Sequence, residues 1–521
     1  MSLELVKEAV RLNQSIGEDT TQHVVENDII VPDVKPDIVR ILMLDGEAWI
    51  NGAEAATDRL LVNGTIRYKI LYVSDDPDQP VRSITTSSAF QYSMDIPNTR
   101  QGMSCRAKCD IEHMEYEILN SRKVNVKTII SLYGRVTDQS DQYVTQDFTG
   151  VDGIQVLRNT ISVNSYIGDC SSECPIREIL DIPAGKPAIL EILRSDVKIT
   201  SKEYKPIDDK IVASGELNIS TLYVSDDETR SIQFVEHEIP FNHLIELPGV
   251  NEDSYCDIEL ELRDVLTEAA EDADGELRQL KCDVNLNFFA ECYGTKNIEL
   301  VEDAYSPYSR VAIEKDQLTV EEVVSENKSQ VTLKEIVELD ETAPPISELF
   351  NVLGKISLSG SEISDGYVTV EGVVVSNMLY LADNSEQPVY CAGREIPFRQ
   401  TVNMEGARAG MGLGVEMDME HLSYSIISPK EVELRFVIGI NTRLNRQVSV
   451  PIISKAAEQP LDEKRLEEEP SVTIYFTQPG DTLWNIAKRH YTTVEEIVMN
   501  NDLDDAREIT PGEQIIILKK Q

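Results

Sequence analysis

The sequence contains no apolar run long enough to cross a bilayer and nothing that looks like an export signal. The first residues, Met1–Glu8, lack the basic region and the apolar region of a secretory signal. No apolar stretch approaches the roughly 20 residues that a transmembrane helix needs. We therefore expect a protein that is not inserted in a membrane and stays in the cytosol of the cell that makes it.

Basic residues are also scarce. The chain has 48 Lys and Arg residues against 92 Asp and Glu residues, which gives a formal net charge of −44. Such a surface repels nucleic acid and anionic lipid, so neither is expected as a partner. Hydrophobic residues make up 41% of 521 residues, which is enough for packed interiors in three or four domains.

Signatures of catalysis are missing as well. The sequence has no phosphate-binding P-loop, no G-x-S-x-G elbow and no H-E-x-x-H pair. The glycine-rich stretch Gly410–Gly414 leads into an alternating strand, which favours a loop over a phosphate cradle. The six histidines share no position between the repeats described below: His23, His113, His237, His243, His421 and His490. We expect a protein that is not an enzyme and has no cofactor.

Eight cysteines in so long a chain do not make a disulfide scaffold. Two pairs share a C-x-x-x-C spacing, Cys105 with Cys109 and Cys170 with Cys174. Four thiolates could hold zinc tetrahedrally, but zinc ribbons usually place two residues between their ligands and close them with tight glycine turns. Reduced, half-buried thiols are the favoured interpretation, and zinc stays open as the alternative.

The chain does contain one strand-like sequence pattern that occurs three times. Alternate residues are apolar or small in Leu60–Tyr72, Ile211–Tyr223 and Val368–Tyr380, and the positions between them are largely polar. The second copy starts 151 residues after the first, and the third starts 157 residues after the second. A period of two predicts a strand with one buried face. Asp pairs such as Asp75-Asp76 follow the strand and lack the ligand spacing of a calcium loop, so we interpret them as hairpin turns.

Each copy also has a glycine in mid-strand and a phenylalanine in the return segment. A glycine inside a strand weakens it, so we interpret these three as bends or bulges where the sheet curls. The glycines are Gly64, Gly215 and Gly372, and the phenylalanines are Phe90, Phe241 and Phe398.

Short alternating runs with frequent turn signals predict a mainly β protein, with three antiparallel β-sandwich or barrel-like repeats and a small domain at the end. The predicted repeats span 1–140, 141–299 and 300–452. We expect a short amphipathic helix at Leu5–Leu12, where apolar residues have helical spacing. The charged, proline-bounded stretch 453–471 predicts an extended linker.

The last fifty residues, 472–521, predict a strand, two helices and a strand. Val472–Phe476 alternates, and Asp481 or Thr482 is placed to cap a helix that begins near Leu483. Thr493–Glu496 has the form of a capping box for a second helix. Ile515–Leu518 predicts the closing strand.

This segment resembles a LysM domain. The residues that carry the resemblance are Gly480–Ala487, Asn501 and Pro511–Ile515. LysM domains typically bind N-acetylglucosamine polymers in a shallow groove between two loops. The resemblance implies a groove for glycan or a partner that comprises Gly480, Asp481, Thr482, Leu483, Asn501, Leu503, Ile509 and Pro511.

Other roles compete for these positions. Leu483, Ile486 and Ile515 suit a core, and Gly480 and Gly512 suit turns. Acidic residues near the groove favour a protein over an acidic peptidoglycan: Asp502, Asp504, Asp505 and Glu508. The chain departs from the family at His490-Tyr491, where a glycine usually ends the first helix. Tyr491 enters the left-handed conformation only at a cost, so we expect an altered connection between the helices.

The three upstream repeats resemble the SPOCS domain, and the combination with a C-terminal LysM domain resembles the SipL-type spore-coat morphogenetic proteins. The resemblance implies a non-enzymatic adaptor in the mother-cell cytosol at the forespore surface. Its LysM domain would dock to the ATPase of the coat's basement layer, stage IV sporulation protein A, and the repeats would meet other coat proteins.

Two alternatives remain. One is a protein that binds peptidoglycan or N-acetylglucosamine and targets cortex or cell wall. A weaker one is a LysM-anchored hydrolase with an unrecognised site in one repeat.

Overall fold

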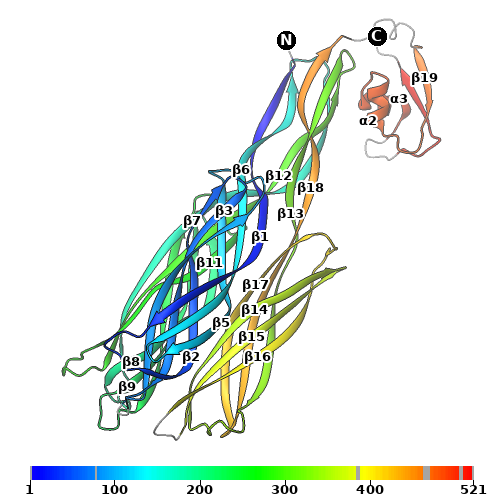
Figure 1. The fold of residues 1–521 in the computed structure, drawn as a ribbon. Coiled ribbons are helices and arrows are strands. Elements are labelled where there is room, and N and C mark those ends of the chain that lie inside the picture. Colours follow the sequence, from blue (N-terminus) through cyan, green and yellow to red (C-terminus); the bar gives the residue numbers. More distant parts are fainter. Residues whose placement is uncertain (1–2, 77–78, 383–387, 461–469, 504–508, 519–521) are drawn as a thin grey trace.

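The computed structural model describes residues 3–76, 79–382, 388–460, 470–503 and 509–518. Within these residues the chain forms an elongated trunk of long antiparallel strands, made by the three repeats, and a small head near the C-terminus (Figure 1). The mainly β fold class predicted from the periodicity is confirmed.

Each repeat contributes six strands. The first repeat has β1 (Glu4–Ile30), β2 (Ile38–Ala56), β3 (Arg59–Ser74), β4 (Val81–Asp95), β5 (Ser104–Asn120) and β6 (Lys123–Thr149). The second has β7 (Gln155–Asp181), β8 (Ile189–Ile207), β9 (Lys210–Ser225), β10 (Ile232–Glu246), β11 (Tyr255–Ala270) and β12 (Gln279–Tyr305). The third has β13 (Arg310–Glu338), β14 (Glu348–Ser364), β15 (Tyr367–Leu381), β16 (Val389–Asn403), β17 (Gly412–Ser428) and β18 (Glu431–Gln459).

The three repeats share one topology. In the first, one antiparallel sheet has the order β1-β6-β5 and the other has the order β2-β3-β4. The second and third repeats have the same two orders, with β12 and β18 in the place of β6 and with β9 and β15 in the place of β3. The apolar faces of the two sheets form one core per repeat, and in the first repeat Tyr68 on β3 and Val126 on β6 belong to the same buried cluster.

The shared strand is the middle strand of the second sheet, as its alternation requires. In β3 the residues Leu60, Ile66, Tyr68 and Tyr72 are fully buried, and the residues that alternate with this apolar set, such as Asn63 and Arg67, face outward. A strand paired on both sides with one face in a core gains most when every second residue is apolar.

The mid-strand glycines make room for the phenylalanines. Gly64 lies directly opposite Phe90 in the β3–β4 ladder, and a Cβ atom on Gly64 would stand 2.4 Å from Cζ of that ring. On the other side the pairing of β2 with β3 shifts register between Ile50 and Gly52. The equivalent pairs Gly215–Phe241 and Gly372–Phe398 repeat the arrangement. The predicted bulge is therefore present, but it lies in the neighbouring strand. The glycine has a second role, because its lack of a Cβ atom leaves space for the phenylalanine ring.

The strands β1, β6, β7, β12, β13 and β18 extend beyond the sandwiches and together form a stem (Figure 1). Twenty-seven residues in β1 correspond to about 90 Å of extended chain. The long antiparallel pairs β1–β6, β7–β12 and β13–β18 each have a register shift where they leave their sandwich, such as the one between Ser15 and Gly17. Beyond that point, equivalent residues of the three repeats meet in one apolar cluster that includes Leu12, Val163 and Val320.

The helix predicted for Leu5–Leu12 is wrong. These residues belong to β1 and pair with β6, for example Val10 with Gln142. Val10 and Leu12 are buried in the stem, whereas Ala9 and Arg11 are exposed, which is the period of a strand. Eight residues cannot form a stable helix without support, and pairing with a long partner strand overrides their local spacing.

The predicted repeat boundaries fall inside strands. The boundary between 140 and 141 lies in β6, the one between 299 and 300 lies in β12, and the one between 452 and 453 lies in β18. The first part of the predicted linker therefore continues β18 to Gln459, where Ile453 is buried and Gln459 pairs with Arg310. Residues 461–469 of that linker lie outside the described residues.

The three repeats pack on one another through the outward face of the shared strand. Leu71, Leu222 and Leu379 occupy the same position in β3, β9 and β15, and they meet in one buried cluster. Each of these leucines stands on the outward face of its strand, where a residue suited to solvent would be expected. This feature of the sequence indicates the contact. Burial of each such side chain contributes about 2 kcal/mol.

An ion-pair network joins the first two repeats. Arg194 on β8 bonds Asp196 through Nε at 2.5 Å and Asp45 on β2 through Nη2 at 2.6 Å. Lys69 on β3 lies 3.4 Å from Asp196. Burial alone would raise the pKa of Asp196, but the guanidinium of Arg194 and the ammonium of Lys69 outweigh it and hold this pKa below its ordinary value.

Cys105, Cys109, Cys170 and Cys174 are free and partly buried, as expected. Cys256 on β11 and Cys292 on β12 lie directly opposite each other and are joined as a disulfide, which the sequence reasoning did not anticipate. Cys105 and Cys109 pack on the core of the first repeat, whereas Cys170 and Cys174 pack on that of the second. The four residues of the zinc alternative are therefore split between two cores.

Candidate functional site

The head has the predicted order of elements. It comprises β19 (Val472–Phe476), α2 (Leu483–Arg489), α3 (Val494–Asn501) and β20 (Gln514–Leu518), and β19 pairs with β20. The predicted capping box is present: the Thr493 hydroxyl accepts from the Glu496 amide, and the Glu496 side chain accepts from the Thr493 amide. Ile486, Ile497 and Ile515 form the core of the head.

The first predicted groove loop is built around a turn and a helix cap. Gly480 has a φ of +89°, which explains the glycine, and Thr482 caps α2 by accepting from the Asn485 amide at 3.1 Å. Asp481 accepts from the Tyr475 hydroxyl at 2.7 Å and from the Gln478 amide at 2.9 Å. The hydrogen bond from Tyr475 holds the pKa of Asp481 below its ordinary value. The carboxylate of Asp481 therefore stabilises the loop.

Asn501 has an internal role too. Its Nδ2 donates to the carbonyls of Ile497 and Ile516, both at 2.8 Å, and its Oδ1 accepts from the Ile516 amide at 2.7 Å. The side chain therefore joins the end of α3 to β20 and has little hydrogen-bonding capacity left for a ligand.

The remaining predicted groove residues divide between core and surface. Leu483, Leu503 and Ile509 are partly buried and pack on the core of the head. Pro511 is exposed, next to a turn in which the Gly512 amide donates to the Thr477 carbonyl at 2.7 Å. Of the eight predicted groove residues, Gly480, Thr482 and Pro511 are exposed. Of the acidic residues predicted beside it, Asp502 is exposed, and Asp504, Asp505 and Glu508 lie outside the described residues.

The prediction for Tyr491 is wrong. Tyr491 adopts the left-handed conformation, with a φ of 51°, so the connection keeps the geometry that a glycine would give. The Thr492 amide then donates to the Ala487 carbonyl at 3.1 Å, which closes the helix as in a Schellman motif. A tyrosine in this conformation costs about 1 kcal/mol, and the surrounding contacts must outweigh that cost.

One of those contacts comes from the trunk. The hydroxyl of Tyr305, the last residue of β12, donates to the Thr492 carbonyl at 2.9 Å. The Tyr305 ring stands edge-on to Trp484 on α2, with centroids 4.8 Å apart and an interplanar angle of 73°. Burial raises the pKa of Tyr305, which keeps its hydroxyl protonated as a donor.

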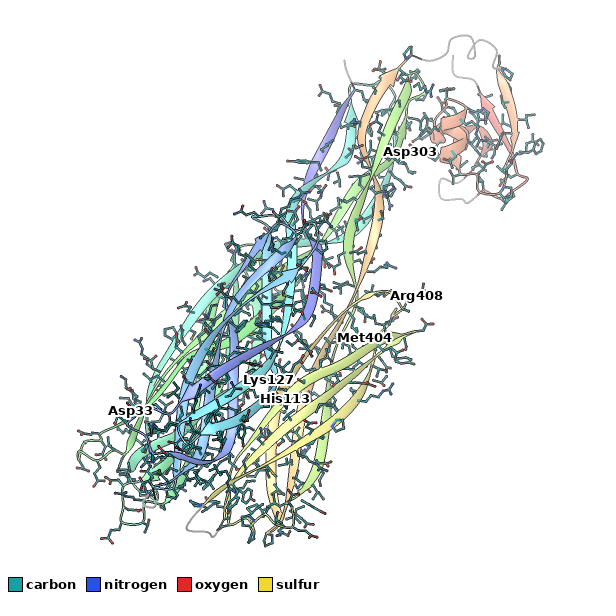
Figure 2. All side chains as sticks on the ribbon, in the orientation of Figure 1. Asp33, His113, Lys127, Asp303, Met404 and Arg408 are labelled. Atoms are coloured by element: carbon teal, nitrogen blue, oxygen red, sulfur yellow. A yellow bond between two sulfur atoms is a disulfide. The ribbon has the colours of Figure 1, made fainter. Side chains whose placement is uncertain are left out.

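Asp303 completes the contact between trunk and head. Its carboxylate accepts from Nε1 of Trp484 at 2.9 Å and from Nζ of Lys488 at 2.7 Å. Burial alone would raise the pKa of Asp303, but the hydrogen bonds from Lys488 and Trp484 hold it below its ordinary value. Figure 2 labels Asp303 at the end of the stem, beside the head.

The head is therefore docked on the trunk as well as linked to it. Docking uses the face of α2 that carries Trp484 and Lys488, whereas Gly480, Thr482 and Pro511 keep their exposure. The sequence reasoning missed Asp303, Tyr305 and Trp484. Trp484 stood within the LysM motif, but its partners lie about 180 residues away, and no local pattern connects them.

We also searched the described residues for a metal site and for helices that could span a membrane. No group of three or more His, Cys, Asp or Glu side chains among the described residues is placed to hold a metal ion. Burial raises the pKa of the Cys109 thiol to about 12, which keeps it protonated. None of the described helices is both long and apolar enough to span a membrane.

Comparison with known protein families gives two matches. The SipL, SPOCS domain family matches three times, at residues 37–119, 188–269 and 345–427. The LysM domain family matches residues 475–518. The three SPOCS matches begin just before β2, β8 and β14 and end near the ends of β5, β11 and β17, so the long stem strands lie outside them. No curated protein and no solved structure matches the chain.

Both families are binding or adaptor domains without catalytic activity, and the SPOCS domain relates the chain to sporulation. The order of the matches is the order expected from the sequence motifs. The chain is a protein of three SPOCS repeats and a C-terminal LysM domain, which is the SipL-type architecture.

Proposed function

We propose that this protein is a non-enzymatic adaptor in spore-coat assembly, whose LysM head docks to the coat's basement-layer ATPase, stage IV sporulation protein A, at the forespore surface. The trunk presents three SPOCS domains to other coat proteins from the mother-cell cytosol. The observation that carries the proposal is the combination of three SPOCS matches with one LysM match in a single chain.

The geometry of the head supports this role. Trunk and head meet through Trp484, Lys488 and Thr492, which leaves the loop that contains Thr482 and the turn at Pro511 accessible to a partner. The net charge of −44 favours a protein partner with a basic surface, because complementary charge steers the two molecules together.

The direct test is capture of the purified ATPase by the full chain and by a chain that lacks residues 472–521. We expect capture by the full chain and its loss with the deletion. Equal recovery with both chains would exclude the head as the docking site.

A point variant tests the surface more finely. Pro511→Arg places a long charged side chain on the exposed turn and should weaken capture by about tenfold or more. Met499→Arg is the matched control, because Met499 is 75% exposed on α3 and outside the predicted groove. Equal loss in both variants would point to a general defect of the head.

The LysM match itself favours a second candidate, binding of peptidoglycan or N-acetylglucosamine in the same groove. This function would target the protein to cortex or cell wall. Sedimentation of the full chain with purified peptidoglycan separates the two candidates. Glycan binding predicts co-sedimentation that Pro511→Arg abolishes, whereas a pure adaptor stays in the supernatant.

A further inference from the structure

Cys256 and Cys292 differ from the other cysteines because they face each other across two neighbouring strands. They form a directly opposed pair in the β11–β12 ladder, and their Cα atoms lie 4.2 Å apart. This spacing is typical of a non-hydrogen-bonded pair of antiparallel strands, in which the side chains approach closely. The two sulfur atoms therefore meet within the existing strand pairing, and no rearrangement of the ladder is needed to join them.

The equivalent pairs in the other two repeats contain no second thiol. In the first repeat Cys105 lies opposite Val136, and in the third repeat Leu413 lies opposite Leu444. Val136, Cys292 and Leu444 hold the same position in β6, β12 and β18, counted from the first residue, and all three are fully buried. The fold therefore holds this pair of positions together without a covalent bond in two of the three repeats.

The C-x-x-x-C pairs are placed differently. Cys105 and Cys109 are four residues apart along β5, which corresponds to about 13 Å, and Cys170 and Cys174 have the same spacing along β7. A disulfide needs Cα atoms within about 7 Å of each other, so neither of these pairs forms one. In the described strand ladders, the six free cysteines all lie opposite other residue types.

The proposed cytosolic location makes a permanent disulfide unexpected, whichever partner the head binds. Thiols in the cytosol are kept reduced, and the disulfides that do occur there are usually transient and either catalytic or redox-sensing. Both families found in this chain are binding or adaptor domains without catalytic activity. The remaining role for the pair is redox sensing.

The strand β11 carries contacts of the second repeat to both of its neighbours. It lies at the edge of its sheet and is hydrogen-bonded to β12 on one side. Just before Cys256, the Tyr255 ring packs under the guanidinium of Arg443 from the third repeat, with 3.8 Å between Cζ and the ring centroid. Just after Cys256, the carboxylate of Asp257 accepts from Nη1 of Arg106 in the first repeat at 3.0 Å. A covalent bond at Cys256 therefore fixes the backbone from which both of these side chains project.

We propose that Cys256 and Cys292 form a reversible redox switch, which is open as two thiols under reducing conditions and closed as the disulfide under oxidising ones. The closed switch holds the start of β11 against β12 and keeps Tyr255 and Asp257 in place for the third and first repeats. The ends of strands open more readily than their centres. Cys256 is the second residue of β11, so the bond restrains the part of the strand that opens first.

A low-molecular-weight disulfide such as oxidised glutathione is the oxidant. The thiolate of Cys256, which is half-buried and the more accessible of the two, attacks one sulfur of the reagent and displaces the first small thiol. The thiolate of Cys292, which is fully buried, then attacks the sulfur of Cys256 and displaces the second. Two protein thiols become one disulfide, the reagent disulfide becomes two thiols, and the two protons pass from the protein to the released thiols. An excess of a dithiol such as dithiothreitol reverses the exchange.

The first test counts thiols in the full chain. Folded protein is treated with dithiothreitol or with oxidised glutathione, and it is then unfolded and alkylated with iodoacetamide. We expect eight alkylated cysteines after reduction and six after oxidation, with Cys256 and Cys292 recovered as one linked pair of peptides by mass spectrometry. Eight alkylated cysteines after oxidation, or a link between other cysteines, would overturn the proposal. Six alkylated cysteines after reduction of the folded chain would overturn it too, because the bond would then be permanent.

The second test measures the restraint on β11 by hydrogen exchange with mass spectrometry. The amides of Tyr255–Leu262 should exchange about tenfold or more slowly in the oxidised chain than in the reduced chain. The equivalent segment of β17, Gly412–Met419, contains no cysteine and should exchange equally in both states. Equal exchange of Tyr255–Leu262 in the two states would overturn the switch.

Variants assign the effect to this pair. Cys292→Val introduces the residue that the first repeat has at this position, and it should abolish the difference in exchange between the two states. Cys105→Val is the matched control, because Cys105 holds the equivalent position on β5 and lies opposite Val136. It should keep the full difference. If Cys292→Val does not fold, Cys256→Val makes the same test at a half-buried position on the edge strand, and a difference that survives in a variant of the pair overturns the proposal.

Discussion

The trunk and the head of this protein are stabilised in different ways. In the trunk, equivalent leucines of three repeats meet in one buried cluster, and each repeat has its own apolar core. The head has a small core of its own and meets the trunk through one carboxylate, one ammonium, one hydroxyl and two aromatic rings. The difference lies in the apolar surface at each contact: Tyr305 and Trp484 supply it between head and trunk, whereas a larger buried cluster supplies it between the repeats.

The largest expected effect comes from the ion pairs inside the trunk. Arg194→Ala leaves the buried Asp196 without its main counter-charge and should lower the free energy of unfolding by about 3–5 kcal/mol. Urea denaturation measures it. Arg177→Ala removes an exposed ion pair and should cost at most about 0.5 kcal/mol. Similar losses in both variants would contradict a buried network between the first two repeats.

The next effect concerns a feature that only the trunk has, the glycine under a phenylalanine ring. Gly64→Ala places a Cβ 2.4 Å from the Phe90 ring and 2.5 Å from the Trp49 carbonyl oxygen, which cannot move aside. We expect a loss of about 1–3 kcal/mol in the free energy of unfolding. Gly360→Ala in β14 meets no atom within 4 Å and should be nearly neutral, so a comparable loss there would argue against a steric cause.

A smaller effect is expected where trunk and head meet. Asp303→Asn removes the charge that Lys488 and Trp484 share and should weaken docking by about 1 kcal/mol, because Lys488 is partly exposed to solvent. Small-angle scattering should report a larger maximum dimension. Asp502→Asn makes the same chemical change elsewhere in the head and should leave the dimension unchanged.

Acid should have the same effect as this substitution. The pKa of Asp303 is lowered in the docked state, so its contribution is complete above the ordinary aspartate pKa of 3.8 and is lost as the pH falls through the lowered value. Docking that is insensitive to pH in this acid range would mean that the aromatic contact alone holds the head.

The smallest effect is a gain of stability within the head. Tyr491→Gly relieves the left-handed tyrosine and should raise the free energy of unfolding of the head by about 0.5–1 kcal/mol. Differential scanning calorimetry of the full chain measures it as a shift in the transition of the head. A loss of stability would show that contacts of the Tyr491 side chain outweigh the backbone cost.

Prediction from the sequence succeeded where the signal is local. The alternation in β3, β9 and β15 and the capping box at Thr493 involve residues that are near neighbours along the chain. It failed at Leu5–Leu12 and at Ile453–Gln459, because both segments become strands by pairing with partners more than a hundred residues away. Spacing within eight residues does not tell a weak helix from the end of a long strand.

For the candidate site, the motif predicted the turn and the caps of the head but not the hydrogen bonds that occupy its side chains. Asp481 and Asn501 stood in the predicted groove, and both are occupied by hydrogen bonds within the head. Asp303 and Tyr305 come from the second repeat, and nothing near them in the chain marks them as partners of the head.

By itself, the sequence determined the three repeats, the strands with one buried face and the βααβ order of the head, because hydrophobic periodicity and capping act between neighbouring residues. Only the tertiary structure decided how the repeats meet, where the stem lies and which face of the head is covered. Those features depend on side chains from distant segments, and the free energy of their contacts exists only once the whole chain has folded.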